Sequence, residues 1–323
     1  MSSASSGLRR EAQFVVARSH ARFLQDVWRG LGTEPRWLDS KYLYDDAGSG
    51  LFDAITLTPE YYLTRCELSI LRDEARAIGD LLGPGCAVIA PGGASGLKLR
   101  ALLEGFEAPV AAVIVDLSDP VWDQSPLSPA HPDLPLFRLN ADFSLPVALP
   151  PLPEARRRVV FFGGSTLGNF VPKQAAGLLR HFASWAGPEG RILVGTDLPK
   201  DPSSLIRAYD DATGLTAAFN LNLLRRINRD LGGDFDLERF SHRVRWNGAE
   251  SRIEMHLRSD VAQSVRIAER SFSFRRFETI HTENAYKWSF MDFERLAKCA
   301  GLRVIGRWTD SQNRYALQLL ENP

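Results

Sequence analysis

The stretch that decides the fold is residues 88–100, VIAPGGASGLKLR. A β-like apolar run over 86–90 stops at Pro91, and a loop of small residues leads into an apolar, basic segment that begins at Leu97. A strand, a glycine-rich turn and a helix start are the parts of a nucleotide-binding corner. The loop matches neither usual phosphate-binding pattern, because GxxxxGK[ST] is absent and Ala94 stands where GxGxxG needs its second glycine. The stretch therefore predicts a nucleotide-binding corner without naming the nucleotide.

The rhythm of the chain around this corner predicts an open α/β sheet. Apolar runs that read as strands alternate with segments of helical period. We expect strands at 86–90, 111–116, 135–139, 158–163 and 191–196, and helices at 65–82, 97–105, 119–125 and 173–186. Nearly continuous apolar strands separated by helices are typical of a parallel sheet that helices cover on both faces.

Segments outside this block have another character. The aromatic-rich stretch 41–65 predicts two helical pieces, and residues 203–231 read as long and helical. Residues 241–282 hold alternating strands such as RIEMHLRS and RSFSFRRF, which are typical of an antiparallel sheet. A helix at 289–300 precedes two strands around a turn at 311–313, and we expect this terminal hairpin to rejoin the first sheet.

The composition narrows the class of protein. Hydrophobic residues make up 44% and charged residues 24%, as in ordinary globular proteins. The 39 Lys and Arg residues balance 39 Asp and Glu residues, so we expect no nucleic-acid partner. Without a signal-peptide h-region or a long apolar run we expect no membrane association and a cytoplasmic location. We also expect a monomer. The widely spaced Cys66, Cys86 and Cys299 argue against disulfides and zinc, and predict buried free thiols.

Polar side chains at the ends of the predicted strands indicate which nucleotide binds. Asp116 closes the second strand, about 20 residues after the loop, where a carboxylate can bind a ribose diol. Asp142 and Phe143 follow the next strand, placed for the amino group and face of an adenine. S-adenosylmethionine (SAM) carries no pyrophosphate, so this loop of small residues fits SAM better than NAD. Either acid alone could be a turn or capping residue, and the pattern by itself does not choose SAM.

Longer strings carry a resemblance to a known family. They are SKYLYDDAGSGLFDAIT, TPEYYLTR, FFGGSTLGN, GTDLPKD, AYDDATGLTAAFNLNLLRRINRDLGGDFD, IEMHLRS and HTENAYK. Together they resemble the histidine Nα-methyltransferases of ergothioneine biosynthesis, from about residue 37 to the C-terminus. The resemblance implies a SAM-dependent enzyme that converts L-histidine to hercynine by three successive methylations.

The resemblance also implies the fold and its division. We expect an α/β protein with a Rossmann-like SAM-dependent methyltransferase domain and a second, smaller α+β substrate domain. The expected methyltransferase domain comprises 64–199 and 287–323. The expected substrate domain comprises 9–63 and 200–286.

On the cofactor side, the family's loop reads like ELGSGSSxKTR, whereas this chain has APGGASGLKLR. Ala90 lacks the family's acid and Ala94 lacks its glycine, which bears on SAM affinity and not on the location of the site. The residues that match the family's cofactor contacts are Gly92, Lys98, Asp116, Asp142, Phe143 and Ser165.

On the amino-acid side, the resemblance implies a clamp for the α-carboxylate and amine at Asn169 and Tyr209, with Tyr61 as a further carboxylate contact. Tyr44, Asn169 and Tyr209 are the expected catalytic residues. The other residues expected at the substrate are the pocket wall Phe52, Met255 beside the imidazole, Glu283 bound to it, and Ala285, where the family commonly has serine.

Without the resemblance each of these residues has an ordinary structural explanation. Tyr44 and its aromatic neighbours would be core, Asn169 could cap the helix that begins near Pro172, and Glu283 would be a surface strand residue. We interpret His281 as a strand residue and not as a catalytic base. No His, Cys or carboxylate cluster has metal-ligand spacing, so we expect no metal.

Three functions remain open at this point. The first is trimethylation of L-histidine to hercynine. The second keeps the chemistry and changes the substrate to another aromatic amino acid, such as tryptophan. The third is a non-catalytic relative whose altered loop no longer binds SAM.

Overall fold

The structure is a computed structural model that describes residues 20–93, 96–117 and 127–323. Ala94 and the expected helix at 119–125 lie outside the described residues. The backbone packs into two compact units. Unit 1 is formed by residues up to Phe52 with Asp210–Arg245 and Glu254–Glu283, and unit 2 by Asp53–Tyr209, Trp246–Ile253 and Asn284–Pro323. The functional roles expected for two domains stay a prediction.

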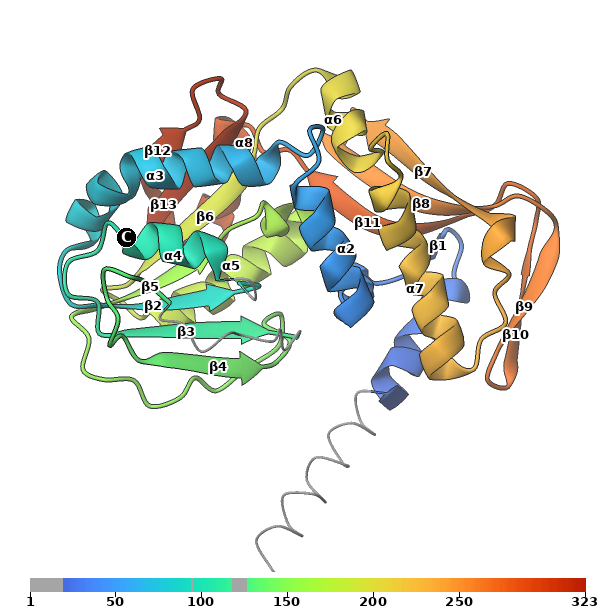
Figure 1. Cartoon of the computed structure of the whole chain (residues 1–323), viewed down its shortest axis with the longest axis horizontal. Helices are drawn as coiled ribbons and strands as arrows, with labels where there is room; N and C mark the ends of the chain where they lie inside the picture. Colours follow the sequence, from blue (N-terminus) through green and yellow to red (C-terminus); the bar gives the residue numbers. More distant parts are fainter. Residues whose placement is uncertain (1–19, 94–95, 118–126) are drawn as a thin grey trace, which may run out of the picture. The chain divides into compact units, whose positions relative to one another are not determined.

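Unit 2 is built on a seven-stranded sheet with the order β12-β13-β6-β5-β2-β3-β4 (Figure 1). Its parallel strands are β2 (Cys86–Pro91), β3 (Ala111–Asp116), β4 (Leu136–Asn140), β5 (Arg157–Phe162) and β6 (Arg191–Asp197). These strands confirm the five predicted from apolar runs. Their carboxyl ends therefore meet at one edge of the sheet, where the candidate site residues follow.

Helices cover both faces of this sheet. The helices of unit 2 are α3 (Leu63–Leu82), α4 (Leu97–Leu103), α5 (Pro172–Ala186), α6 (Pro202–Tyr209) and α8 (Phe290–Cys299). Alternate strand residues such as Val113, Val115, Val160 and Phe162 share a core with α5 and α8. Because successive strand side chains point to opposite faces, the buried residues between them, such as Phe161, face the other side, where α3 packs against α4.

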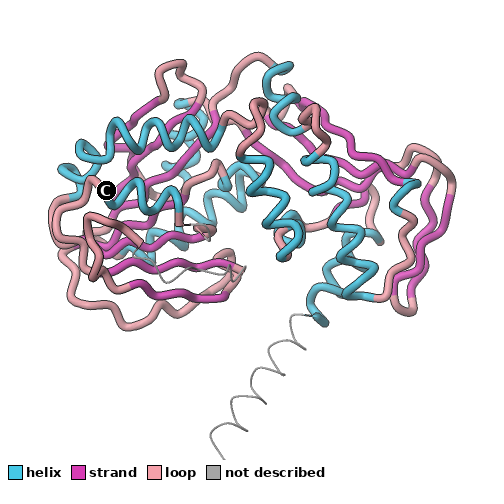
Figure 2. The backbone as a smooth tube through the Cα atoms, viewed as in Figure 1, coloured by secondary structure: helices cyan, strands magenta, loops and turns pink. Residues whose placement is uncertain are grey.

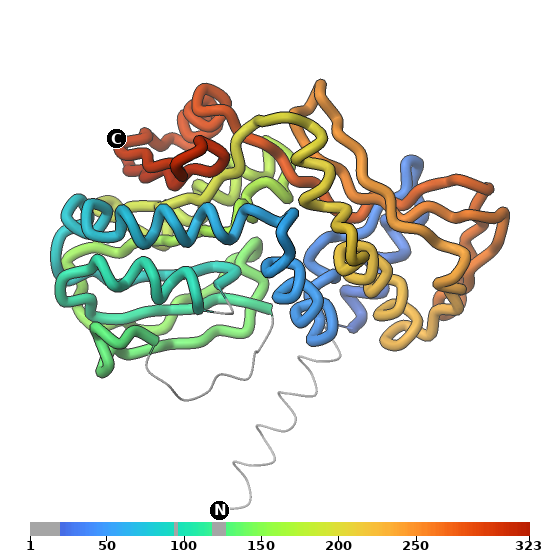
Figure 3. The backbone as a smooth tube through the Cα atoms, turned by 45° about the horizontal axis from the view of Figure 1, so that its top comes forward, coloured from blue at the N-terminus to red at the C-terminus, as the bar shows by residue number. Residues whose placement is uncertain are grey.

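The C-terminal hairpin completes the sheet, as the sequence predicts (Figure 3). Strands β12 (Arg303–Thr309) and β13 (Tyr315–Glu321) pair antiparallel, and β13 pairs antiparallel with β6. An open parallel sheet that ends in one antiparallel hairpin confirms the expected Rossmann-like α/β class.

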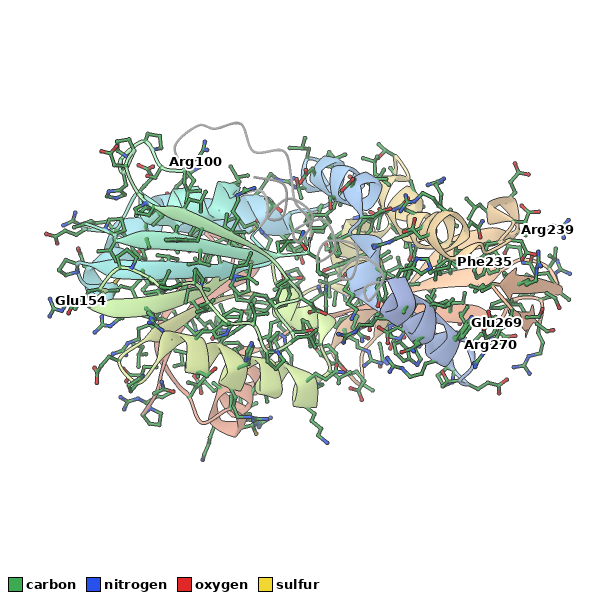
Figure 4. The ribbon with its side chains drawn as sticks, turned by 90° about the horizontal axis from the view of Figure 1, so that it is seen from below. Arg100, Glu154, Phe235, Arg239, Glu269 and Arg270 are labelled. Carbon is green, nitrogen blue, oxygen red and sulfur yellow. The ribbon has the colours of Figure 1, made fainter. Side chains whose placement is uncertain are left out.

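Unit 1 combines a four-stranded sheet, a two-stranded sheet and helices (Figure 2). Its elements are the helix over 20–31, β1 (Arg36–Trp37), η1 (Ser40–Leu43), the start of α2 (Asp46–Thr56), α7 (Leu215–Leu231), η3 (Leu237–Arg239), β9 (Gln263–Ile267), β10 (Arg270–Phe274) and the greater part of β7 (Phe240–Asn247), β8 (Arg252–Ser259) and β11 (Thr279–Tyr286). The end of β7, the start of β8 and the end of β11 belong to unit 2. Phe235 packs against Phe240 and Phe274, and the Arg270 guanidinium lies 4.3 Å from the ring centroid of Trp28. Figure 4 labels Phe235 and Arg270, two of these packed residues of unit 1.

Two expectations from the sequence need correction, and one strand was not expected. This strand is β1, which pairs parallel with β11 and has two residues, too few for a periodic signal. The expected long helix over 203–231 is two helices, because the Asp211 carboxylate accepts from the amides of Leu215 and Thr216 and so starts a new helix. Cys66 and Cys86 are buried free thiols as expected, whereas Cys299 is exposed.

The structure describes residues 20–93, 96–117 and 127–323, and two absences hold for these ranges. Among these residues, no helix is long and apolar enough to cross a membrane. Within the same ranges, no group of three or more His, Cys, Asp or Glu side chains could hold a metal ion.

Candidate active site

The corner after β2 has the geometry of a close-approach turn. Gly92 has φ of +68°, a conformation that favours glycine, and its amide donates to the Val115 carbonyl at 2.9 Å. A side chain at this position would contact the Phe143 ring, whose nearest atom lies 3.5 Å from the would-be Cβ. Phe143 itself packs edge-on against Phe162 at the end of β5. The structure thus brings together Gly92 and Phe143, two of the expected cofactor residues.

The two expected acids lie at the ends of adjacent strands. Asp116 is the last residue of β3 and pairs in register with Asn140, the last residue of β4. Asp142 follows two residues later, and the Asp116 carbonyl accepts from the Ala141 amide at 2.9 Å. Asp142 also accepts from the Ser144 amide at 3.0 Å, so it forms the turn that the structural explanation anticipated.

A buried carboxylate that the sequence analysis missed lies behind the corner. Glu67 on α3 is fully buried and forms an ion pair with Lys98 of α4 at 2.6 Å. The same carboxylate accepts from the Gly164 amide at 3.0 and 2.9 Å. A side chain at Gly195 would overlap Glu67, which explains the glycine there. Glu67 therefore links the helix after β2 to the loop after β5.

The expected carboxylate clamp lies in unit 2. Tyr61 and Tyr209 are both buried, with ring centroids 6.2 Å apart in an edge-on arrangement. Asn169 ends the 3₁₀ turn η2 (Thr166–Asn169), and α5 is capped by Val171 and not by Asn169. Gly168 in this turn packs so closely on Tyr286 that a Cβ would lie 2.9 Å from its carbonyl oxygen. The turn that carries Asn169 is thus held against the end of β11.

A buried ionic cluster stands beside Tyr209. Asp197, fully buried at the end of β6, pairs with Lys287 at 2.8 Å and with Lys200 at 2.5 Å. The Tyr62 hydroxyl donates to the Asp197 carboxylate at 2.8 Å. Lys287 Nζ also donates to the Tyr209 hydroxyl at 3.0 Å. Burial, followed by the nearby Asp197 carboxylate, raises the pKa of Tyr62, so this phenol stays protonated.

Ser165 joins this cluster through its hydroxyl, which accepts from the Asp197 amide at 3.0 Å. Ser165 is buried and has φ of +57°, in the left-handed region that residues other than glycine seldom adopt. Such a conformation is held only where the surroundings determine it. The loop after β5 is therefore fixed at both Gly164 and Ser165.

Unit 1 holds the expected pocket walls. The ring centroid of Tyr44 lies 5.5 Å from Phe52 and 5.3 Å from Phe219, and all three rings are in mutual contact. Phe219 on α7 was not predicted, although it stands in the long matching string around AFNLNLL. Next to Tyr44, Asp45 accepts from the Gly48 amide and the Asn222 side chain. These contacts tie the start of α2 to α7.

Met255 and Glu283 lie on neighbouring strands, β8 and β11. The Thr282 hydroxyl donates to the Met255 carbonyl at 3.1 Å, which keeps the two strands in register at this point. Glu283 is 8% exposed, so the explanation as a surface strand residue is wrong. Met255 is buried as well. Glu283, the expected imidazole partner, and Met255, its expected apolar neighbour, thus both lie on neighbouring strands of unit 1.

His281 is explained by local structure. Its ring stacks on His256 with centroids 4.9 Å apart, and its Nε2 is 3.0 Å from the Glu283 carbonyl. Burial lowers the pKa of His256 to about 4, with the His281 ring adding to the effect, so His256 is neutral at physiological pH. The interpretation of His281 as a strand residue fits these contacts.

The sequence analysis missed Glu67, Lys287, Lys200 and Tyr62, which stand far from the motif in the chain. A signal existed for Asp197 and Lys200, because both belong to the matching string GTDLPKD at the end of a predicted strand. Lys287 likewise ends the matching string HTENAYK. None of these residues has a periodicity or spacing of its own that indicates a role.

Comparisons with known proteins agree on one family. The chain matches the model of a family described as "Histidine-specific methyltransferase, SAM-dependent" over residues 23–322. It is 38% identical to the histidine N-alpha-methyltransferase of Mycolicibacterium smegmatis, over 95% of this chain and 98% of that protein. It is 37% identical to the protein of the same name from Mycobacterium tuberculosis, over 93% of this chain and 95% of that protein. It is also 28% identical to ergothioneine biosynthesis protein 1 of Neurospora crassa, over 88% of this chain and 33% of that protein. Because the family model spans nearly the whole chain, the chain belongs to the family of SAM-dependent, histidine-specific methyltransferases.

Proposed function

We propose that this chain transfers methyl groups from SAM to the α-amino group of L-histidine, three times in succession, to form hercynine in ergothioneine biosynthesis. The observation that carries the proposal is the family match over residues 23–322. The names of the two mycobacterial relatives support the same substrate and the same nitrogen. The division into a methyltransferase domain and a substrate domain is part of this proposal.

The edge of the seven-stranded sheet fits SAM. The positive φ of Gly92 allows a sharp turn at the end of β2, where we place the methionine part of SAM. Asp116 and Asp142 follow adjacent strands, so they can accept from a ribose and from an adenine amino group respectively. Lys98 and Ser165 complete the proposed set by fixing the loops after β2 and β5.

Methyl transfer requires the protein mainly to bind the substrate amine and to orient it. A bound SAM supplies an electrophilic methyl group on its sulfonium. The amine must present a neutral lone pair in line with the bond that breaks, so positioning is most of the catalysis. We assign the α-carboxylate and amine to Asn169 and Tyr209, with Tyr61 as a further carboxylate contact.

The side chain and the product are recognised by other residues. We assign the imidazole to Glu283, which can accept from its N–H, and to Met255 beside the ring. The contacting rings of Tyr44 and Phe52 suit a trimethylammonium product, because a cation without donors binds well against π-faces.

Mass spectrometry of the products tests the proposal. Purified protein incubated with SAM and L-histidine is expected to release a product with three added methyl groups, and Asn169→Ala to lower this turnover while leaving binding of S-adenosylhomocysteine (SAH) nearly unchanged. Histamine, which lacks the carboxylate, serves as the negative substrate, and L-tryptophan as the competing one.

Three results would count against the proposal in different ways. Release of mostly monomethylated product would contradict trimethylation. Faster turnover of L-tryptophan than of L-histidine would show that tryptophan, and not histidine, is the preferred substrate. No binding of SAH by calorimetry would favour a non-catalytic relative.

We also propose that the protein is a cytoplasmic monomer that acts on free amino acid and binds neither nucleic acid nor membrane. Light scattering coupled to size-exclusion chromatography, and fractionation of the source cells, check these points. A stable dimer at micromolar concentration would contradict the monomer.

A further inference from the structure

Lys287 is the most deeply buried cation of the cluster in unit 2. Its side chain is 0% exposed, like that of its partner Asp197, and the two form an ion pair at 2.8 Å. The backbone on either side is also held, because the Lys287 amide donates to the Ser251 carbonyl at 2.7 Å and the Trp288 amide donates to the Asp197 carbonyl at 3.0 Å. The ion pair and these backbone hydrogen bonds fix the direction of the Lys287 side chain.

The ammonium group of Lys287 points toward the ring and hydroxyl of Tyr209. Lys287 Nζ donates to the Tyr209 hydroxyl oxygen at 3.0 Å and lies 4.6 Å from the centroid of its ring. An ammonium group has donors and no acceptor, and a phenol has one proton. Since the Tyr209 oxygen accepts from Lys287, the Tyr209 proton points away from the lysine. A phenol that accepts from a cation is also a stronger donor through the polarisation of the linked hydrogen bonds.

The charges in the cluster also favour the approach of an anion to Tyr209. Asp197 carries one negative charge and is paired with two lysines, Lys200 and Lys287. Lys287, whose side chain is fully buried, thus shares its carboxylate partner with a second lysine, and a further anion stabilises a buried ammonium group. An amino acid that approaches Tyr209 by its α-carboxylate supplies one.

We propose that Lys287 is a positioning residue for the α-carboxylate of the substrate: it fixes the Tyr209 hydroxyl as a donor toward that carboxylate. The inference rests on the proposed function, which assigns the carboxylate to Tyr209. Lys287 does not touch the reacting atoms and acts through Tyr209. The selectivity that it adds is for the carboxylate and not for the imidazole.

Lys200 offers a matched control. It pairs with the same carboxylate of Asp197 and donates to Tyr62 at 2.7 Å, whereas the hydrogen bond to Tyr209 comes from Lys287. Burial lowers the pKa of Lys200, against the opposing effect of Asp197. Removing either lysine leaves Asp197 one cation and the Tyr62 hydroxyl, so both variants keep a paired carboxylate.

The test is calorimetry of L-histidine and of histamine binding to the full chain in the presence of SAH, for the parent and for Lys287→Met, Lys200→Met, Tyr209→Phe and the Lys287→Met/Tyr209→Phe double variant. We expect Lys287→Met to weaken L-histidine binding at least about tenfold, as for loss of a charge-assisted hydrogen bond. Histamine and SAH affinities should change less than about twofold, because neither ligand presents this carboxylate. The double variant should bind L-histidine like Tyr209→Phe alone, because coupled residues are non-additive.

Each outcome bears on the proposal. Unchanged L-histidine affinity in Lys287→Met, additive losses in the double variant, or equal losses in the two lysine variants would overturn it. Equal losses would mean that the buried charge acts without positioning Tyr209. Failure of the parent itself to bind L-histidine would instead overturn the proposed function. If Lys287→Met does not fold, as judged by SAH binding, Lys287→Gln takes its place, because it removes the charge and retains a hydrogen-bonding side chain.

Discussion

At the scale of single residues, our proposal assigns recognition of the imidazole to β11. Glu283 is buried, and two residues later Ala285 is buried as well. Residues two apart in a strand project from the same face. The family commonly has serine at the position of Ala285, so this chain lacks one hydroxyl that could bind the second imidazole nitrogen.

This difference leads to a paired prediction. Ala285→Ser should tighten L-histidine binding about two- to tenfold, the effect of one added hydrogen bond. Glu283→Ala should weaken it by more than the serine variant gains, because a charge-assisted hydrogen bond is lost. SAH affinity, measured by calorimetry, should be unchanged in both variants. If Ala285→Ser binds L-histidine more weakly than the parent does, and the parent prefers tryptophan as a substrate, the assignment of histidine as the substrate is wrong.

The single residue Glu67 supports the helix that follows the altered loop. Ala90 stands where the family commonly has an acid. The structure has a carboxylate from α3 that binds Lys98 and the Gly164 amide. Glu67 precedes the corner in the chain, and no local motif could indicate its contact with Lys98.

At the scale of elements, Glu67 joins α3, α4 and the loop after β5. Glu67→Gln should lower the free energy of unfolding by about 2 kcal/mol or more, because Lys98 would lose its counter-ion while remaining largely covered. It should also weaken SAH binding, since two loops of the proposed cofactor site lose a common anchor. Urea unfolding and calorimetry measure the two effects.

Asp73→Asn is the matched control for this prediction. Asp73 is an exposed acid on the same helix α3, so the same change of charge should alter stability by less than about 0.5 kcal/mol. Equal stability of the two variants would show that Glu67 does not act as the link between the elements.

The elements differ in how well their sequences predict them. The parallel strands were predicted because they are short apolar runs, and β2, β3 and β6 are buried on both faces. β1 was not, because two residues carry no period, and its pairing with β11 joins positions more than two hundred residues apart. The interruption between α6 and α7 was missed because it depends on the Asp211 carboxylate binding the first amides of α7.

At the scale of the whole molecule, stability should depend on pH through His256. Burial lowers the pKa of His256 to about 4 in the folded protein, whereas the ordinary histidine value is 6.5. The folded state therefore favours the neutral ring, so the contribution is fully present above pH 6.5 and is lost as the pH falls from 6.5 toward 4. Its size is about 3 kcal/mol, since one pKa unit corresponds to about 1.4 kcal/mol.

Urea unfolding at a series of pH values measures this effect. The free energy of unfolding of the parent should fall more steeply between pH 6.5 and 4.5 than that of His256→Gln, which cannot titrate. His20→Gln, at an exposed position, should run parallel to the parent. Parallel profiles for the parent and His256→Gln would contradict the prediction.

The sequence by itself determined the class of fold, the order of its main elements and the family. These follow from information that is local or linear: apolar runs of strand length, a glycine-rich turn between strand and helix, and long matching strings. The strand-end acids Asp116 and Asp142 were also found this way, because in a parallel sheet the carboxyl ends of the strands meet at one edge.

Only the tertiary structure decided which side chains support these residues. Glu67 contacts Lys98 and Gly164, and Lys287 contacts Asp197 and Tyr209, across separations of 31 to 97 residues in the chain. A charged residue in a helix or strand has the same local signature whether it faces water or a buried partner. Burial, and with it the strength and direction of an ion pair, exists only once distant segments have packed together.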